Sequence, residues 1–237
     1  MHGKRNVLTD LLDCVLPRYC VVCGKRLLAP ERDLCLGCLA DIPYTYMWTE
    51  RGQWVFSLFY YNDVSPYKRL ALSVKYMGNS SLGVRLGRLL GSYAALAGNG
   101  LGGIDIVAPV PLHWTRKWKR GYNQSEMIAE GFVSGYGSVC GKYPLLLPSL
   151  FKRRRRTASQ TYVNVADKVS NVRNAFVLGG DSAVVDALVK ENGRVRILIV
   201  DDTCTTGATL LSCSSALKTY GISVEVLFAS VAKVRED

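Results

Sequence analysis

The sequence predicts an α/β protein with a parallel, doubly wound sheet and a small cysteine-rich segment at its amino-terminal end. Residues 194–200 end in four consecutive aliphatic side chains, which is the pattern of a strand buried on both faces. Expected strands alternate with expected helices along the chain, and this order favours a parallel sheet. Two C-x-x-C pairs within residues 20–38 set the first segment apart. At 237 residues the chain is long enough for one such domain and an appendage.

Local signals define each expected element in chain order. The expected strands span residues 54–61, 104–109, 194–200 and 222–228. The expected helices run from Ser65-Pro66 to Gly78, over 80–97, from Asn123 to about Phe132, and along an apolar face from Leu210 to Tyr220. Ser65 is a favourable cap, and Asn123 with Glu126 resembles a capping box. Gly221 is expected to end the last helix.

The charge is unevenly distributed along the chain. The 30 basic and 19 acidic residues leave a net charge of +11, and residues 51–160 hold 16 of the basic residues against 4 acidic ones. With 49% hydrophobic and 21% charged residues, the composition excludes a disordered or collagen-like chain. The basic middle predicts a surface for anions, either the phosphates of a small molecule or those of a nucleic acid.

The cysteine spacing predicts a metal site. No stretch approaches 18 consecutive apolar residues and residues 1–16 do not resemble a signal peptide, so we expect a cytoplasmic protein without membrane insertion. Disulfides are disfavoured in that compartment. Cys20, Cys23, Cys35 and Cys38 supply four thiolates for one tetrahedral Zn²⁺. Because residues 1–50 hold few large apolar side chains, the zinc is expected to be structural.

The most informative segment is the end of the strand at residues 194–200. Asp201 and Asp202 follow this strand, and the small residues 205–209 (TTGAT) lead into a helix. Adjacent carboxylates at the carboxyl end of a strand can accept hydrogen bonds from vicinal hydroxyls. The backbone N–H groups of a helix start can hold a phosphate. The segment therefore predicts a ribose 5-phosphate site, and the alternative is an ordinary turn with solvated acids.

Residues 197–209 are similar to the phosphoribosyl-pyrophosphate (PRPP) loop of type I phosphoribosyltransferases. Other motifs resemble the ComF family, the competence-protein-F phosphoribosyltransferases of bacteria. These motifs are Leu16–Gly24, Lys75–Gly78, Val110–Leu112, Arg116, Arg120–Gln124, Arg156–Gln160 and Asn174–Phe176. The resemblance covers roughly residues 11–232. It implies a type I phosphoribosyltransferase fold over 51–237, a zinc ribbon over 1–50, and a role in DNA uptake and natural transformation.

The resemblance also implies roles for individual residues. Asp201 and Asp202 would be the catalytic pair that binds the ribose diol. The PRPP-binding residues would be Thr205, Thr206, Gly207, Ala208, Thr209, Lys75, Arg116 and Arg120. Mg²⁺ would bridge the pyrophosphate and the diol oxygens. The implied partners are PRPP or a related phosphoribosyl ligand, single-stranded DNA and other competence proteins, and the implied reaction is a pentosyl transfer to an acceptor that the sequence does not identify.

A run of five cations at Lys152–Arg156 allows several interpretations. It is either a solvated loop, a lid that closes over PRPP, or a contact to single-stranded DNA through Arg153, Arg154, Arg155 and Arg156. Two functions therefore stay open. One is a phosphoribosyltransferase. The other is a non-catalytic DNA-binding competence factor that uses its PRPP site for binding or regulation. A zinc-ribbon transcriptional regulator is a weaker third.

Overall fold

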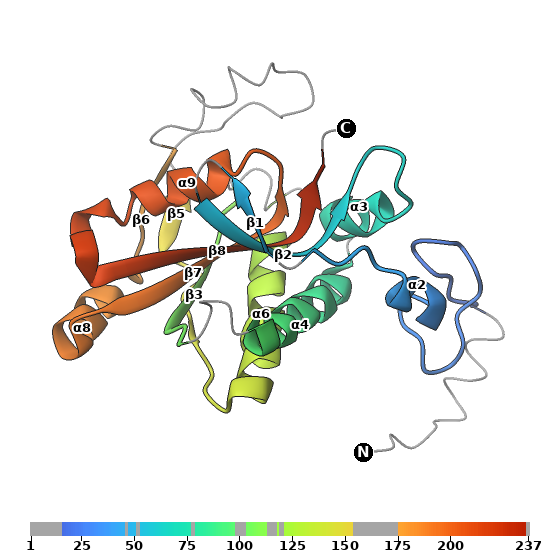
Figure 1. Cartoon of the computed structure of the whole chain (residues 1–237), viewed down its shortest axis with the longest axis horizontal. Helices are drawn as coiled ribbons and strands as arrows, with labels where there is room; N and C mark the ends of the chain where they lie inside the picture. Colours follow the sequence, from blue (N-terminus) through green and yellow to red (C-terminus); the bar gives the residue numbers. More distant parts are fainter. Residues whose placement is uncertain are drawn as a thin grey trace.

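The structure, a computed structural model, describes residues 16–45, 47–50, 53–76, 79–97, 103–112, 118, 121–153 and 175–235 (Figure 1). Within these residues the strands are β1 (Met47–Glu50), β2 (Gln53–Tyr61), β3 (Ile106–Pro109), β4 (Leu145–Leu146), β5 (Phe151–Arg153), β6 (Phe176–Leu178), β7 (Val195–Cys204) and β8 (Val224–Val234). The helices are α2 (Leu36–Ala40), α3 (Lys68–Tyr76), α4 (Ser80–Ala97), α6 (Gln124–Cys140), α8 (Ser182–Asn192), α9 (Ala208–Ser215) and the 3-10 helix η1 (Lys218–Ser223).

The main sheet has the strand order β1-β2-β8-β7-β3-β4. Five adjacent strands in this order, β2, β8, β7, β3 and β4, run parallel to one another. The edge strand β1 pairs antiparallel with β2. The short strands β5 and β6 form a separate antiparallel pair. The predicted α/β class with a largely parallel sheet is confirmed. Because the strands are parallel, their carboxyl ends meet at one edge of the sheet, where ligands bind in open α/β folds.

The central strand β7 separates two hydrophobic cores. Leu198 and Val200 pack into a core shared with α3, α4 and α6, whereas Ile197 and Ile199 pack into a core shared with α8, α9, β5 and β6. All four side chains are fully buried. Figure 1 shows α4 and α6 on one side of the sheet and α9 on the other. The four consecutive aliphatics in the sequence are thus explained by burial on both faces.

Several predicted boundaries differ from the structure, and the last strand, expected over 222–228, spans Val224–Val234. The helix that begins after Asn123 continues to Cys140, because Gly141 is the first residue to adopt the left-handed conformation that ends it. The helix expected to reach Tyr220 ends at Ser215 and is followed by η1, in which Gly221 has a positive φ. The strand expected to end at Val200 continues through Cys204, because β8 pairs with it that far.

Helix α8 has no counterpart among the expected elements. Asp181 precedes it and Gly193 ends it, and these were the signals in the sequence that could have located it. Val185 is its one buried side chain, and Leu188 and Val189 pack against the same core while partly exposed. The pair β5–β6 was also not predicted, because strands of three residues are too short for an alternation to be detected.

Helices α4 and α6 pack backbone against backbone through glycines. A Cβ atom at Gly131 of α6 would lie 2.0 Å from the carbonyl oxygen of Val84, and one at Gly87 of α4 would lie 2.1 Å from that of Ile128. These separations are far below any van der Waals contact, so only glycine fits. The close approach fixes where the amino-terminal end of α6 meets the sheet.

We expect Gly131→Ala to lower the free energy of unfolding by about 2 kcal/mol, because a clash with backbone places the cost of overpacking at the upper end of about 1–3 kcal/mol and the helical preference of alanine offsets about 1 kcal/mol of it. Urea denaturation followed by circular dichroism measures the change. Gly180→Ala is the matched control, since a Cβ there meets no atom within 4 Å. Equal stability of the two variants would contradict the tight helix contact.

Candidate functional site

The four predicted cysteine ligands converge in the structure. Cys20 and Cys23 flank a turn, Cys35 caps α2, and Cys38 lies within that helix. Their sulfur atoms all lie within 4.8 Å of one another, and the Sγ atoms of Cys23 and Cys35 are 3.7 Å apart. Tetrahedral coordination with Zn–S bonds of about 2.3 Å requires sulfur atoms about 3.8 Å apart. The four cysteines could therefore hold a metal ion, and the donor set fits zinc.

The backbone around Cys20 favours a thiolate. Burial raises the pKa of Cys20, but backbone N–H groups of Cys23, Cys35 and Val22 lower it more, and the resulting pKa is about 7. Burial and the three neighbouring thiols raise the pKa of Cys38. A cation at the centre of the cluster would reverse this second effect, since a coordinating thiol is deprotonated by its metal.

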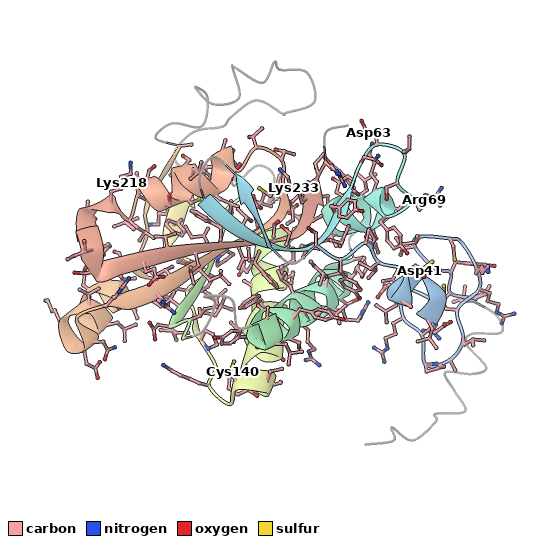
Figure 2. All side chains as sticks on the ribbon, viewed as in Figure 1. Asp41, Asp63, Arg69, Cys140, Lys218 and Lys233 are labelled. Atoms are coloured by element: carbon pink, nitrogen blue, oxygen red, sulfur yellow. The ribbon has the colours of Figure 1, made fainter. Side chains whose placement is uncertain are left out.

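The cysteine-rich segment is attached to α3 and α4. The hydroxyl of Tyr67 donates to the carbonyl of Cys38 at 3.0 Å, and Nη1 of Arg69 donates to the carbonyl of Val22 at 3.0 Å. Figure 2 shows Arg69 on α3, on the side of the cysteine-rich segment. A further contact joins the Asp33 carboxylate to Arg85 of α4 as an ion pair. The segment is thus held by side chains of the main domain as well as by its own cysteines.

The carboxylate pair lies at the carboxyl end of β7. Oδ1 of Asp201 accepts hydrogen bonds from Oγ of Ser125 at 2.9 Å and from the backbone N–H of Asp202 at 2.8 Å. Burial, followed by the negative charge of Asp202, raises the pKa of Asp201 to about 7. The hydrogen bond from Ser125 and the charge of Lys75 oppose this shift. Asp201 therefore titrates near neutral pH.

Lys75 of α3 balances the second carboxylate. Its Nζ lies 3.4 Å from Oδ1 of Asp202, and both side chains are largely buried. Burial lowers the pKa of Lys75, but its electrostatic interactions with Asp202, Tyr61 and Asp201 raise it more, so the pKa is above its ordinary value. The structure thus brings together three residues that the sequence assigned to one site, namely Lys75, Asp201 and Asp202.

The small-residue loop joins β7 to α9 beside these charges. Gly207 is buried with a φ of 67°, a conformation that other residues rarely adopt, and α9 begins at the next residue. The other four loop residues, Thr205, Thr206, Ala208 and Thr209, are partly exposed. Nζ of Lys233, at the end of β8, donates to the carbonyl of Thr205 at 2.5 Å and ties the loop to the sheet (Figure 2). The loop is therefore fixed by the left-handed conformation of Gly207 and by the hydrogen bond from Lys233, and its other residues stay partly exposed to solvent.

Sequence reasoning missed Ser125 and Lys233. Ser125 reaches Asp201 because Asn123 caps α6, accepting from the N–H of Ser125 at 3.2 Å and donating to the carbonyl of Val110 at 3.1 Å. Asn123 was predicted as a cap, so a buried serine two residues later was a usable signal. Lys233 follows the expected last strand, and nothing local distinguishes it from a surface lysine.

Several predicted site residues lie outside the described residues. They are Arg116, Arg120, Arg154, Arg155 and Arg156. Arg153 is described and ends β5, where its guanidinium lies 5.2 Å from the centre of the Phe176 ring.

None of the helices in the described ranges is both long enough and apolar enough to cross a membrane.

Comparisons with known proteins relate the chain to two groups of curated proteins. It is 30% identical over 118 residues to competence protein F of Haemophilus influenzae. It is 28% identical over 158 residues to the DNA utilization protein YhgH of Salmonella typhi, and 26% identical over 211 residues to that of Escherichia coli K12. The matches cover 50%, 66% and 85% of this chain, respectively. No family model matches the chain.

The matches span 46% of the Haemophilus protein, 63% of the Salmonella protein and 85% of the Escherichia protein. The chain thus has homologues named competence protein F and DNA utilization protein. They confirm the resemblance to the ComF family that the sequence motifs indicate.

The raised pKa of Asp201 predicts a pH-dependent stability. In the unfolded chain an aspartate has a pKa of about 3.9. Between that pH and about 7 the folded state binds more protons, so stability falls as the pH rises through this window. Asp201→Asn keeps an oxygen for Ser125 but removes the charge.

We expect the Asp201→Asn variant to be more stable than the wild type by about 1–4 kcal/mol at pH 8, and the difference to vanish near pH 4. The lower end is favoured because the side chain keeps some solvent contact. Urea titrations at several pH values measure the effect, and Asp63→Asn, which alters an exposed carboxylate, is the control. If the stability of Asp201→Asn fell with rising pH as steeply as that of the wild type, the raised pKa of Asp201 would be contradicted.

Proposed function

We propose that this chain binds PRPP or a related phosphoribosyl ligand at the carboxyl edge of its parallel sheet, as a phosphoribosyltransferase-like protein of the ComF type. The observation that carries the proposal is the junction of β7 and α9. There two adjacent carboxylates, Asp201 and Asp202, stand next to the loop 205–209 and its left-handed Gly207. The vicinal hydroxyls of a ribose would donate hydrogen bonds to the carboxylates, and its 5-phosphate would bind to the loop.

The charges around this junction support such a ligand. The carboxylates accept hydrogen bonds from hydroxyls of a ribose, and Lys75 offers a cation next to them. Backbone N–H groups at the start of α9 favour a phosphate. Arg116 and Arg120 would contribute on the pyrophosphate side, and a Mg²⁺ bound with the ligand would supply further positive charge against its phosphates. A five-strand parallel sheet with helices on both faces is compatible with a type I phosphoribosyltransferase fold over residues 51–237.

The corresponding reaction is a pentosyl transfer. A lone pair of the acceptor forms the new bond to C1 of the ribose, while the bond from C1 to oxygen breaks and pyrophosphate leaves with its electron pair. The acceptor gives its proton to solvent. The transition state carries positive charge on the ribose ring, and Asp201 and Asp202 are the groups whose negative charge would stabilise it.

The names of the homologues, competence protein F and DNA utilization protein, support a cellular role in DNA uptake. Single-stranded DNA and other competence proteins are the partners in this proposal. The word DNA in the second name also leads to a second candidate function, a non-catalytic DNA-binding factor that uses the same site for binding or regulation. The cations Lys152–Arg156 would contact DNA phosphates in that case.

Zinc is the proposed occupant of the cysteine cluster. The spacing of the sulfur atoms and the lowered pKa of Cys20 support a tetrahedral thiolate site. In this proposal residues 1–50 form a zinc ribbon whose role is structural. The hydrogen bonds of Tyr67 and Arg69 then connect the ordered ribbon to α3.

Isothermal titration calorimetry with PRPP and Mg²⁺ tests the phosphoribosyl proposal. We expect Asp201→Asn and Asp202→Asn each to weaken binding by about tenfold or more, because hydrogen bonds to charged groups contribute about 1.5–3 kcal/mol. Ribose 5-phosphate should compete, and Asp63→Asn should bind as the wild type does. An absence of heat in the wild type would rule out the phosphoribosyl proposal, whereas binding of PRPP without its consumption, together with salt-dependent binding of single-stranded DNA, would favour the second function.

Elemental analysis tests the zinc proposal. We expect about one zinc per chain in the wild type and in Cys140→Ser, which alters an exposed cysteine outside the cluster. Cys35→Ser should lose the metal, and limited proteolysis should then cut within residues 16–45, because the cluster no longer orders them. A wild-type protein that contains no metal and resists proteolysis would rule the proposal out.

A further inference from the structure

A cleft opens between the cysteine-rich segment and the end of β2. Its volume is about 530 Å³, within the range of small-molecule sites. Three tyrosine rings line it, from Tyr60, Tyr61 and Tyr67. Polar groups come from Asp41, Asn62 and Arg235. A cavity with aromatic walls and a few polar groups suits a planar polar ring more than an aliphatic chain.

Two residues that line the cleft, Tyr60 and Arg235, can stack on a planar ring. The guanidinium of Arg235 lies 5.3 Å from the centre of the Tyr60 ring, and 36% of Tyr60 is exposed to solvent. The position of Arg235 is set by its backbone N–H, which donates to the carbonyl of Tyr61 at 2.9 Å. Guanidinium groups and tyrosine rings both stack on the faces of nucleobases.

Polar side chains of the cleft lining can form hydrogen bonds with the edge of a ring. Asp41, at the end of α2, has an exposed carboxylate that accepts hydrogen bonds from ring or exocyclic N–H groups (Figure 2). Oδ1 of Asn62 accepts from the backbone N–H of Ser65 at 3.1 Å, which orients its amide. The hydroxyl of Tyr67 is engaged with the carbonyl of Cys38, so this ring is a fixed wall.

Tyr61 relates the cleft to the carboxylate pair. It lines the cleft. Its pKa is raised first by burial, Lys75 opposes the shift, and the charge of Asp202 adds to it. One residue of the cleft lining thus interacts electrostatically with the groups proposed to hold a ribose.

We propose that this cleft binds one nucleobase, stacked against Tyr60 and Arg235 with its edge toward Asp41 and Asn62. The proposal rests on the phosphoribosyl and DNA functions proposed above and names the ring that accompanies them. The same chemistry has two sources, a free base or nucleoside and a base within a DNA single strand. The fluorescence of 2-aminopurine, which is quenched when the base stacks, distinguishes them.

The full chain is titrated with two probes, the 2-aminopurine deoxyriboside and a short oligothymidylate that carries one 2-aminopurine. We expect quenching in at least one arm, and the arm identifies the source. Tyr60→Ala and Arg235→Ala should each weaken the quenched complex by about 5- to 100-fold, the range expected for loss of one base–aromatic stack. Tyr60→Phe should keep it, and Tyr143→Ala, an exposed tyrosine that does not line the cleft, should behave as the wild type.

Two outcomes would overturn the proposal: no quenching of either probe by the wild type, or quenching that Tyr60→Ala and Arg235→Ala leave unchanged. Calorimetry with PRPP on the same variants separates this failure from failure of the phosphoribosyl site. Tyr60 and Arg235 do not belong to the carboxylate pair or the loop 205–209, so both alanine variants should bind PRPP as the wild type does.

Discussion

Two adjacent carboxylates near the carboxyl end of β7 are the constraint around which the molecule is arranged. Burial, and then the negative charge of Asp202, disfavours ionisation of Asp201 and raises its pKa to about 7. Groups from two other elements compensate: Lys75 pairs with Asp202, and Ser125 donates to Asp201. Such a costly pair of carboxylates suits hydroxyl donors or a cation as ligands.

Helix α3 connects this charge balance to the cysteine cluster. Near its first turn, Tyr67 and Arg69 hold carbonyl groups of the cysteine-rich segment, and near its last turn Lys75 reaches Asp202. Contacts at the two ends of this helix therefore reach both the cysteine-rich segment and the carboxylate pair. The aromatic cleft is related to both, because Tyr67 and Tyr61 line it and Tyr61 interacts electrostatically with Lys75.

The glycine contact between α4 and α6 has a comparable role on the other side. It brings the two backbones close enough for α6 to start next to the end of β7. The cap at Asn123 then aims Ser125 at Asp201. A change of a few tenths of an ångström in the helix packing would thus reach the carboxylate pair, because packed interiors transmit displacement.

The sequence by itself determined the local features: the cysteine spacing, the strand with two buried faces, the acids at its end, and the glycine turn before α9. Each is set by neighbours along the chain, through periodicity, turn conformation or ligand spacing. Only the tertiary structure decided the partners of these groups, since Ser125 and Asp201 lie 76 residues apart. It also decided that β7 continues past Val200 and that Lys233 anchors the loop, because pairing with β8 and the position of its end depend on the assembled sheet.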